Sequence, residues 1–233
     1  MYPDSRQTIH VGLNARFLPT PIISSHSYLG FQQALLAQGI EFTTASFTPD
    51  EIAVIRERPA RLEIKILNRG QPPVGQLLVV APQPAGGLEL FTKEVEAVGR
   101  ALDSTWTGDR RQILNSDVTF RDLYEASSEH AFRELWEERL QQPAGALGVL
   151  GRPVLGGGLR FFMPPKADDA EAVHITVRIE SYLKDTKKIY VETQFAWPTP
   201  LPPGVPLNPA GRLKQVDDYV EGSVVAFLLG RSP

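Results

Sequence analysis

The feature that most constrains the fold of this chain is an alternation of apolar and polar residues with a period of two. Its clearest example is the run Val-His-Ile-Thr-Val-Arg-Ile-Glu at 173–180. Successive side chains of a β-strand point to opposite faces, so this spacing is typical of a strand with one buried face. The same alternation predicts further strands at 9–17, 62–66, 114–121, 159–163 and 189–197.

Two short polar connections predict β-hairpins, because antiparallel neighbours can be joined by only a few residues. One is the stretch 183–187, between the last two alternating runs. The other is Asn-Arg-Gly at 68–70, between apolar stretches at 61–67 and 77–81.

Amphipathic helices are predicted where apolar residues recur at intervals of three and four. Serines within 24–27 offer N-caps for the first helix, and Gly39 is a suitable C-terminal stop. The sequence Thr-Pro-Asp-Glu at 48–51 resembles a cap followed by a proline in the first turn, which predicts a short helical turn over 49–58. The four apolar stripes cover 31–38, 91–102, 132–140 and 213–227.

Strands with one apolar face and amphipathic helices together predict an α+β fold, in which a largely antiparallel, curved sheet carries helices packed on one face. The order strand, helix, strands, helix occurs twice. We therefore predict a pseudo-duplication with halves at 1–110 and 111–233, which share one sheet and core in a single structural domain. Phenylalanines at matching places in the two cycles support it: Phe17 and Phe120 end the leading strands, and Phe31 and Phe132 open the following helices.

Composition narrows the available chemistry. The chain has no cysteine, which excludes thiolate catalysis, disulfides and thiolate metal ligands. A net charge of −3 argues against strong general affinity for nucleic acid or anionic membranes. The sequence shows neither a signal peptide nor a run of about 18 apolar residues, so we expect a cytoplasmic protein with no membrane partner.

The predicted architecture resembles curved sheets of the helix-grip or TATA-box-binding-protein type, in which two pseudo-symmetric halves share one sheet. The resemblance concerns shape alone. The phenylalanine wedges and the strongly basic character of the TATA-box-binding protein have no counterpart in this sequence.

Several segments are similar to a sporadically distributed family of uncharacterised prokaryotic proteins of about this length. The similarity covers most of the chain, although Ser116 and Asp117 stand where that family has an aromatic residue. It implies scattered occurrence rather than a chemistry, and such occurrence suits an accessory gene of a defence or mobile-element cassette. The segments are Leu-Phe-Thr-Lys-Glu-Val-Glu at 90–96, Arg-Gln-Ile-Leu-Asn at 111–115, and the strand pair 175–180 and 189–197 before a C-terminal helix.

The polar side of the predicted sheet is the main candidate for a binding surface. It mixes both charges and contains arginines, which suits protein recognition better than a DNA backbone. The alternative is plain solvent exposure of the same residues. The candidate residues are His10, Asn14, Arg16, Asn115, Asp117, Arg121, His174, Arg178, Glu192 and Gln194, with Glu63, Lys65 and Thr176 on the same side.

Two histidines lie on that polar side, His10 and His174. If their strands were adjacent, the two imidazoles with Glu180 or Glu192 could bind a metal or transfer protons. No His-x-His or His-Glu-x-x-His spacing is present, so solvated side chains are favoured and no metal or cofactor is predicted.

Other conspicuous motifs have simpler interpretations. The three glycines at 156–158 lack the spacing of a phosphate-binding loop and precede a strand, so a flexible entry or bulge is favoured. The acidic pairs at 168–169 and 217–218 are interpreted as solvated surface. The proline-rich segment 197–209 could form a polyproline II ligand, but a stiff loop into the last helix is favoured.

The sequence therefore predicts a non-enzymatic protein-binding or assembly subunit of a prokaryotic accessory system, acting through the polar sheet face and adjacent loops. A protein partner or a second copy of the chain is expected, and nucleic acid is not expected as a strong direct partner. The alternative is a small-ligand or nucleotide-binding enzyme or sensor, with a pocket between sheet and helices that uses His10 or His174.

Overall fold

A computed structural model describes residues 1–106 and 111–230. Within these ranges nine strands form one antiparallel sheet in the order β2-β3-β4-β5-β1-β6-β9-β8-β7. The strands are β1 (Gln7–Leu18), β2 (Thr44–Thr48), β3 (Glu51–Arg56), β4 (Leu62–Arg69), β5 (Val74–Pro82), β6 (Gln112–Glu125), β7 (Gly158–Met163), β8 (His174–Ser181) and β9 (Lys188–Trp197). The α-helices are α1 (Ser25–Ala37), α2 (Gly87–Thr105), α3 (Ala131–Arg133), α4 (Pro209–Tyr219) and α5 (Val225–Leu228).

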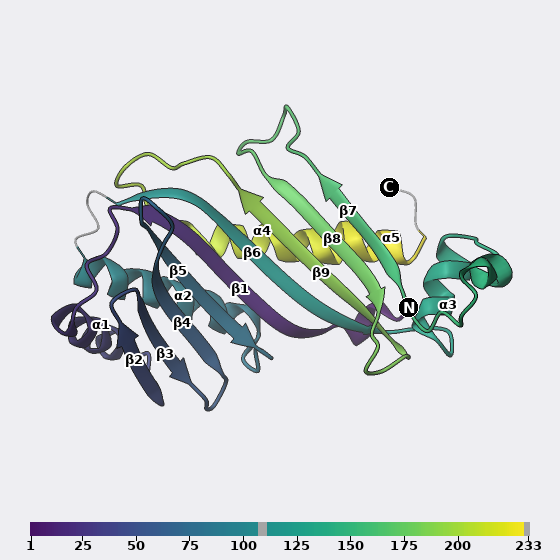
Figure 1. Ribbon diagram of the computed structural model, residues 1–233, viewed down its shortest axis with the longest axis horizontal. Coiled ribbons are helices and arrows are strands. Elements are labelled where there is room, and N and C mark those ends of the chain that lie inside the picture. Colours follow the sequence, from purple (N-terminus) through teal and green to yellow (C-terminus); the bar gives the residue numbers. More distant parts are fainter. Residues whose placement is uncertain (107–110, 231–233) are drawn as a thin grey trace.

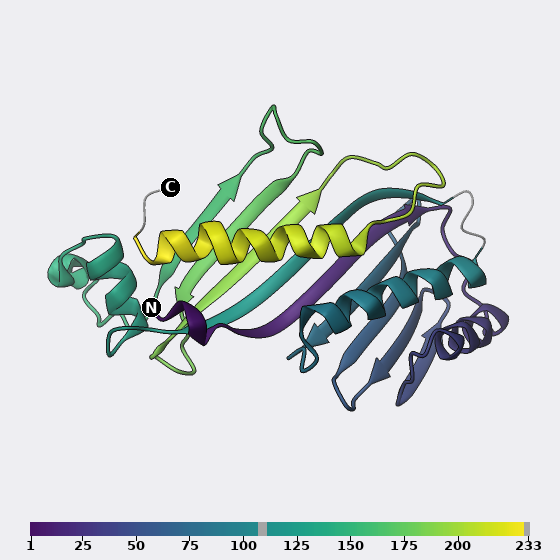
Figure 2. The same ribbon diagram turned by 180° about the vertical axis from the view of Figure 1, so that it is seen from behind.

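The sheet is curved and unclosed, and the long helices pack on one side of it. Figure 2 shows α2 and α4 in front of the strands, while in Figure 1 the strands lie in front of the same helices. The predicted α+β class, with an antiparallel curved sheet and helices on one face, is confirmed.

The element order repeats across the centre of the sheet. Strand β1 is followed by α1, β2 to β5 and α2, and β6 is followed by α3, β7 to β9 and α4. The two leading strands pair with each other, and each is flanked by the last strand of its own cycle. This topology is compatible with two related halves. The division itself stays a prediction, and residues 110 and 233, at which the two halves are taken to end, lie outside the described residues.

The apolar sides of the strands form the core with the helices. Phe31 and Leu35 of α1, and Phe91 and Val95 of α2, are buried in one large cluster, which also contains residues of β1, β3 to β6, β9 and α4. A second cluster lies beneath α5 at the β8–β9 end. Both predicted hairpins, β4–β5 and β8–β9, are present.

One predicted element is wrong. Residues 49–58 do not form a helical turn, because 49–50 are the turn of a β2–β3 hairpin. Ile52 and Val54 alternate with half-buried neighbours, and their branched side chains suit a strand whose one face is covered. The proline therefore opens a hairpin turn instead of a helix.

Two β-bulges change which residues face the helices. Thr8 pairs with Asp122 and His10 with Arg121, so Ile9 is an extra residue in β1. A second irregularity places an extra residue, Leu114, in β6. Ile9 and Leu114 were predicted on the apolar face, and both are only half-buried, whereas Ile113 is buried.

The last two predicted helices contain π-helical turns, at Glu134–Arg139 and Val220–Val224. The second turn shifts the apolar stripe of the C-terminal helix, so the stripe ends on Leu228, which is fully buried, and not on Phe227. Phe227 is 41% exposed and packs edge-on against Phe161, with ring centroids 5.3 Å apart.

The helix ends agree with the predicted caps. Ser24 and Ser27 form a reciprocal capping box at α1, and Gly39 follows the helix with a positive φ of 78°. His130 caps α3, because its Nδ1 accepts a hydrogen bond from the backbone N–H of Phe132.

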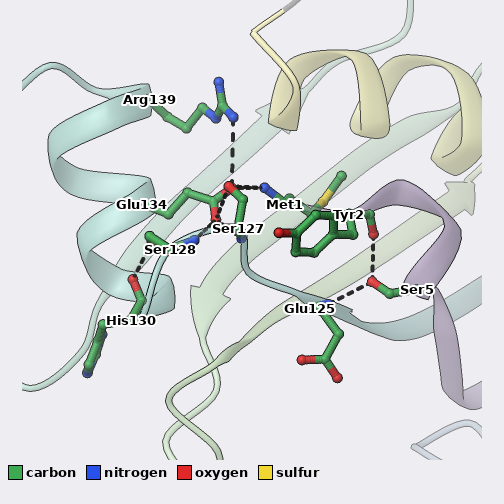
Figure 3. Close-up of polar contacts among 9 residues, drawn as sticks. All are labelled: Met1, Tyr2, Ser5, Glu125, Ser127, Ser128, His130, Glu134 and Arg139. Carbon is green, nitrogen blue, oxygen red and sulfur yellow. Dashed lines mark hydrogen bonds and ion pairs between the residues drawn. The ribbon is translucent and has the colours of Figure 1, made fainter.

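A buried carboxylate ties the N-terminus to the α3 segment, as Figure 3 shows. Glu134 is fully buried and accepts hydrogen bonds from the α-ammonium group of Met1 and from the backbone N–H and hydroxyl of Ser127, at 2.6 and 3.0 Å for the latter two. Burial acts to raise the pKa of Glu134, but these donors outweigh it and hold the pKa below its ordinary value.

A second buried carboxylate joins β1, β6 and α4. Asp122 is fully buried and accepts hydrogen bonds from the Thr8 hydroxyl at 2.6 Å and from Arg6 Nε at 3.1 Å. Arg6 also reaches Asp217 on α4 at 2.8 Å. Asp217 was interpreted as solvated surface, and this contact corrects that interpretation. Asp218 forms an ion pair with Lys214 at the surface.

Candidate functional site

The candidate site is the open face, by which we mean the side of the sheet opposite α2 and α4 (Figure 1). Within the described residues it carries no helix. Pleating brings every second side chain of each strand to this side. On β1 from His10 onward, and on β8 and β9, the residues that face this side have even numbers. On β6 they have odd numbers, from 115 to 123.

One row of side-chain amides crosses four strands of the open face. Gln76 Nε2 donates to Asn14 Oδ1 at 2.8 Å, and Asn14 Nδ2 donates to Asp117 Oδ2 at 2.6 Å. Gln194 Nε2 donates to the other oxygen of Asp117 at 3.3 Å. Burial raises the pKa of Asp117, and these hydrogen bonds with the charge of Arg16 partly oppose it. We call these four residues, 76, 14, 117 and 194, the amide row.

A second row is ionic and lies toward the other end of the same strands. Arg121 Nε donates to Glu192 Oε2 at 2.7 Å, and the Tyr190 hydroxyl donates to the same oxygen at 2.9 Å. Arg178 pairs with Glu180 through two hydrogen bonds, at 2.6 and 2.7 Å, and its guanidinium lies 6.0 Å from the centre of the Tyr190 ring. We call residues 121, 178, 180, 190 and 192 the ionic row.

The remaining predicted site residues lie beside these rows. Arg16 is exposed and stands opposite Asn115 across the β1–β6 pair. His174 stacks on Phe162 of β7 with ring centroids 5.6 Å apart. Its Nδ1 is buried and has no hydrogen-bond partner among the described residues. The structure thus places all ten predicted residues on one face. Six of them belong to the two rows, and five of these six form a hydrogen bond with another of the ten.

The two histidines do not meet. Strands β6 and β9 lie between β1 and β8, and His10 aligns with Arg178 across the sheet, four residues from His174. With strands about 4.8 Å apart and a rise of about 3.3 Å per residue, the histidines are on the order of 20 Å apart. The hypothesis of adjacent strands is therefore wrong. In the described part of the chain no group of three potential ligands could hold a metal ion.

His10 should titrate below the usual histidine pKa. Burial lowers the pKa of His10, the positive charge of Arg121 lowers it further, and Glu192 and Glu63 oppose the shift. Because the folded state disfavours the protonated ring, His10 should cost stability as the pH falls below about 6.5. NMR titration of the imidazole should give a pKa below that value. Arg121→Gln should raise it, whereas Arg178→Gln should leave it unchanged.

The surface between the two rows carries fewer charged side chains than the ionic row. Gly12, Thr119 and Thr176 align with Gln194 of the amide row across four neighbouring strands. On the other side of Gly12, the same line of paired residues continues through Val80 of β5 and Glu63 of β4 to Ile55 of β3. Leu78 of β5, two residues before Val80, pairs with Lys65 of β4. These aliphatic side chains are half-buried. The open face therefore combines two hydrogen-bonded polar rows with an apolar surface that is partly exposed.

The other motifs have structural roles. Gly158 begins β7, where a Cβ would overlap the carbonyl oxygen of Ile179, so the glycines permit a close strand approach. Asp169 accepts a hydrogen bond from the backbone N–H of Lys166 within an exposed loop. The proline-rich segment is a loop from β9 to α4, as favoured, and it is joined to β6 by the N–H of Leu201 and the carbonyl of Ile113, 2.8 Å apart.

Sequence reasoning missed members of both rows. Gln76 lies in a strand that is apolar on both sides, so alternation could not assign its face. Tyr190 belongs to the alternating run 189–197, but it was not among the predicted site residues. Asp122 carried a usable signal, because it follows Val118 and Phe120 at the same spacing and therefore had to point toward the helices.

Comparisons with known proteins add no identity: no family model matches the chain, and no curated protein matches it either. Among the helices of residues 1–106 and 111–230, none has the length and apolar character needed to cross a bilayer. The function must therefore be argued from the open face itself.

Proposed function

We propose that this protein is a non-enzymatic binding or assembly subunit whose open face receives a protein partner or a second copy of the chain. The observation that carries the proposal is the uncovered side of the nine-stranded sheet, on which polar side chains from five neighbouring strands form two hydrogen-bonded rows.

Pre-ordering of the side chains supports binding. Association must offset the entropy lost when long side chains are immobilised, about 0.5–1.5 kcal/mol for each. In the ionic row the arginine side chains are already ordered within the monomer, since Arg121 and Arg178 each donate to a glutamate at 2.7 Å or less. A partner would meet side chains that are already fixed.

The charge pattern favours protein over nucleic acid. Each arginine of the ionic row has a neighbouring glutamate, and Arg16 lies near Asp117. Binding to a phosphate backbone requires a surface with net positive charge, whereas protein interfaces combine arginine and tyrosine with apolar side chains. Arg178, Tyr190 and the half-buried Leu78 and Val80 fit that composition. Membership of an accessory, defence or mobile-element system rests on the sequence resemblance and is part of the proposal.

Charge reversal on the open face should weaken partner capture. Arg178→Glu places three acidic groups together, and like-charge juxtaposition across an interface costs several kcal/mol, so we expect capture to weaken by roughly a hundredfold. Lys214→Glu is the matched control, because Lys214 is also an exposed cation paired with a neighbouring acid, but on α4. The measurement is affinity capture from a lysate of the source organism, with sedimentation velocity of the purified protein.

If both variants retained the same partner as the wild type, the open face would not be the binding surface. Purified protein that stays monomeric and captures nothing would also contradict the proposal.

A second candidate, a ligand sensor at His174, is favoured by one observation. The buried Nδ1 of His174 lacks a hydrogen-bond partner among the described residues, and such atoms call for an explanation. A thermal-shift screen against nucleotides and divalent ions tests it. A reproducible shift that disappears in His174→Ala would establish the sensor in place of a function restricted to protein binding.

A further inference from the structure

The opposite side of the molecule contains a cleft of about 660 Å³ between the sheet, α2 and the proline-rich loop. Neither His10 nor His174 lines it, so it is separate from the open face. Its volume is in the range of small-molecule sites, roughly 300–1,000 Å³. Its apolar walls come from three parts of the fold and include Phe17, Leu77, Val95, Leu102, Ile113 and Val205.

The cleft is already formed in the free protein. Its outer wall is the loop between β9 and α4, and two backbone hydrogen bonds join this loop to β6 and to the residue that precedes β6. The N–H of Leu201 donates to the carbonyl of Ile113 at 2.8 Å, and that of Gly204 donates to the carbonyl of Arg111 at 2.9 Å. A ligand would therefore enter without first ordering this wall, which favours affinity.

Gly99 is a second observation that points to an occupant. It lies inside the 19-residue helix α2 and lines the cleft. Glycine disfavours a helix interior by roughly fivefold relative to alanine. Close packing does not explain it, because a Cβ at Gly99 would have no atom within 4 Å. The glycine weakens the helix, and its visible consequence is to leave the cleft open.

Two cations and two acidic residues line the cleft, and they are Arg100, Arg111, Glu96 and Asp103. Arg111 is 10% exposed, its guanidinium lies 5.2 Å from the centre of the Phe17 ring, and the carbonyl oxygen of Trp106 accepts from it at 2.8 Å. Its acidic partner Asp103 is 52% exposed and lies toward solvent. Arg100 also lines the cleft, with Nε donating to Gln38 at 2.7 Å.

We propose that this cleft binds an amphipathic organic acid. The apolar body of the ligand lies along Phe17, Val95 and the open space beside Gly99. Its carboxylate lies at Arg111, with Arg100 at the rim. This site does not depend on the open face, and its ligand class follows from an apolar lining with a buried guanidinium at one end.

The test uses 1-naphthoate, an aromatic acid, and 1-naphthylmethanol, its neutral analogue, each titrated into the full chain and followed by amide NMR. Naphthoate should give saturable shifts in α2 and in 201–209. The alcohol should bind about tenfold or more weakly, since a hydrogen bond to a charged group is worth that much. Gly99→Leu should fill the cleft and weaken naphthoate binding at least about tenfold, while the Tm stays equal or rises.

Gly30→Ala is the matched control, because Gly30 also lies within a helix but not in the cleft. It should leave binding unchanged. Arg111→Gln tests the charge independently and should reduce naphthoate binding to the level of the alcohol. Unchanged naphthoate binding by Gly99→Leu would overturn the site. Equal binding of acid and alcohol would overturn the ligand class, and the absence of saturable shifts with either compound would overturn both.

Discussion

Arg6→Met should lower the free energy of unfolding by about 3 kcal/mol, because removing one partner of a buried pair leaves the other charge uncompensated. The group left behind is Asp122, which is fully buried and, of the donors among residues 1–106 and 111–230, would keep the Thr8 hydroxyl. Asp217 would lose its 2.8 Å contact with Arg6 as well. Urea denaturation at neutral pH measures the loss.

Two further measurements make this prediction specific to the ion pair. In Arg6→Met/Asp122→Leu neither charge of this pair remains, so most of the lost stability should return. Burial already raises the pKa of Asp122, and loss of Arg6 should raise it further. The folded variant would then bind a proton more readily than the unfolded chain, so its deficit should shrink as the pH falls toward 4. A loss below about 0.5 kcal/mol would show that Asp122 is already neutral or hydrated.

Glu134→Gln should cost about 3 kcal/mol, because it leaves the α-ammonium group of Met1 buried beside a neutral amide. The same carboxylate accepts the backbone N–H of Ser127 at 2.6 Å, and Arg139 lies 3.8 Å away. The substitution should therefore loosen the joint between the N-terminus and the α3 segment seen in Figure 3. Urea denaturation and amide exchange over 127–140 measure the effect.

Glu137→Gln is the control, since Glu137 pairs with Arg133 across one helical turn at the surface and should matter by about 0.5 kcal/mol or less. The pKa of Glu134 is held below its ordinary value, so its contribution is present above pH of about 4.3 and is lost as the pH falls further. The variant should consequently show a flatter stability curve at acid pH than the wild type. Equal curves would contradict the assigned ion pair.

Much of the fold was predictable because alternation reports directly on burial. In β8 and β9 every second residue points into the core, and the two-residue period survives from one end of each strand to the other. The helix starts were also predictable, because Ser24 caps α1 through contacts made within four residues. Local chemistry of this kind does not depend on the rest of the chain.

Features that depend on distant partners were not predictable. The helical signal at Thr-Pro-Asp-Glu was overridden because β3 has β4 beside it, so Ile52 and Val54 find a covered face as strand residues. The bulges at Ile9 and Leu114 come from pairing between β1 and β6, and no signal within either strand reveals them. The π-helical turn at 220–224 likewise adjusts α5 to the core beneath it.

The candidate site was also predictable only in part. Alternation was sufficient to place Asn14, Arg121 and Glu192 on one side of the sheet. Which of them meet depends on strand order, because β6 pairs with β1 on one edge and with β9 on the other. The amide row and the ionic row exist only in that order, and the same order separates His10 from His174.

The measurement that tests the open face most directly is site-specific photo-crosslinking in a lysate of the source organism. A benzophenone amino acid is placed at Thr176, on β8 between His174 and the ionic row of the open face, and in a separate sample at Lys214 on α4. We predict an adduct with a second polypeptide from position 176, none from position 214, and a clear loss of the first on Arg178→Glu. Adducts from position 214 alone, or no adduct from position 176, would contradict the proposal that the open face binds a second polypeptide.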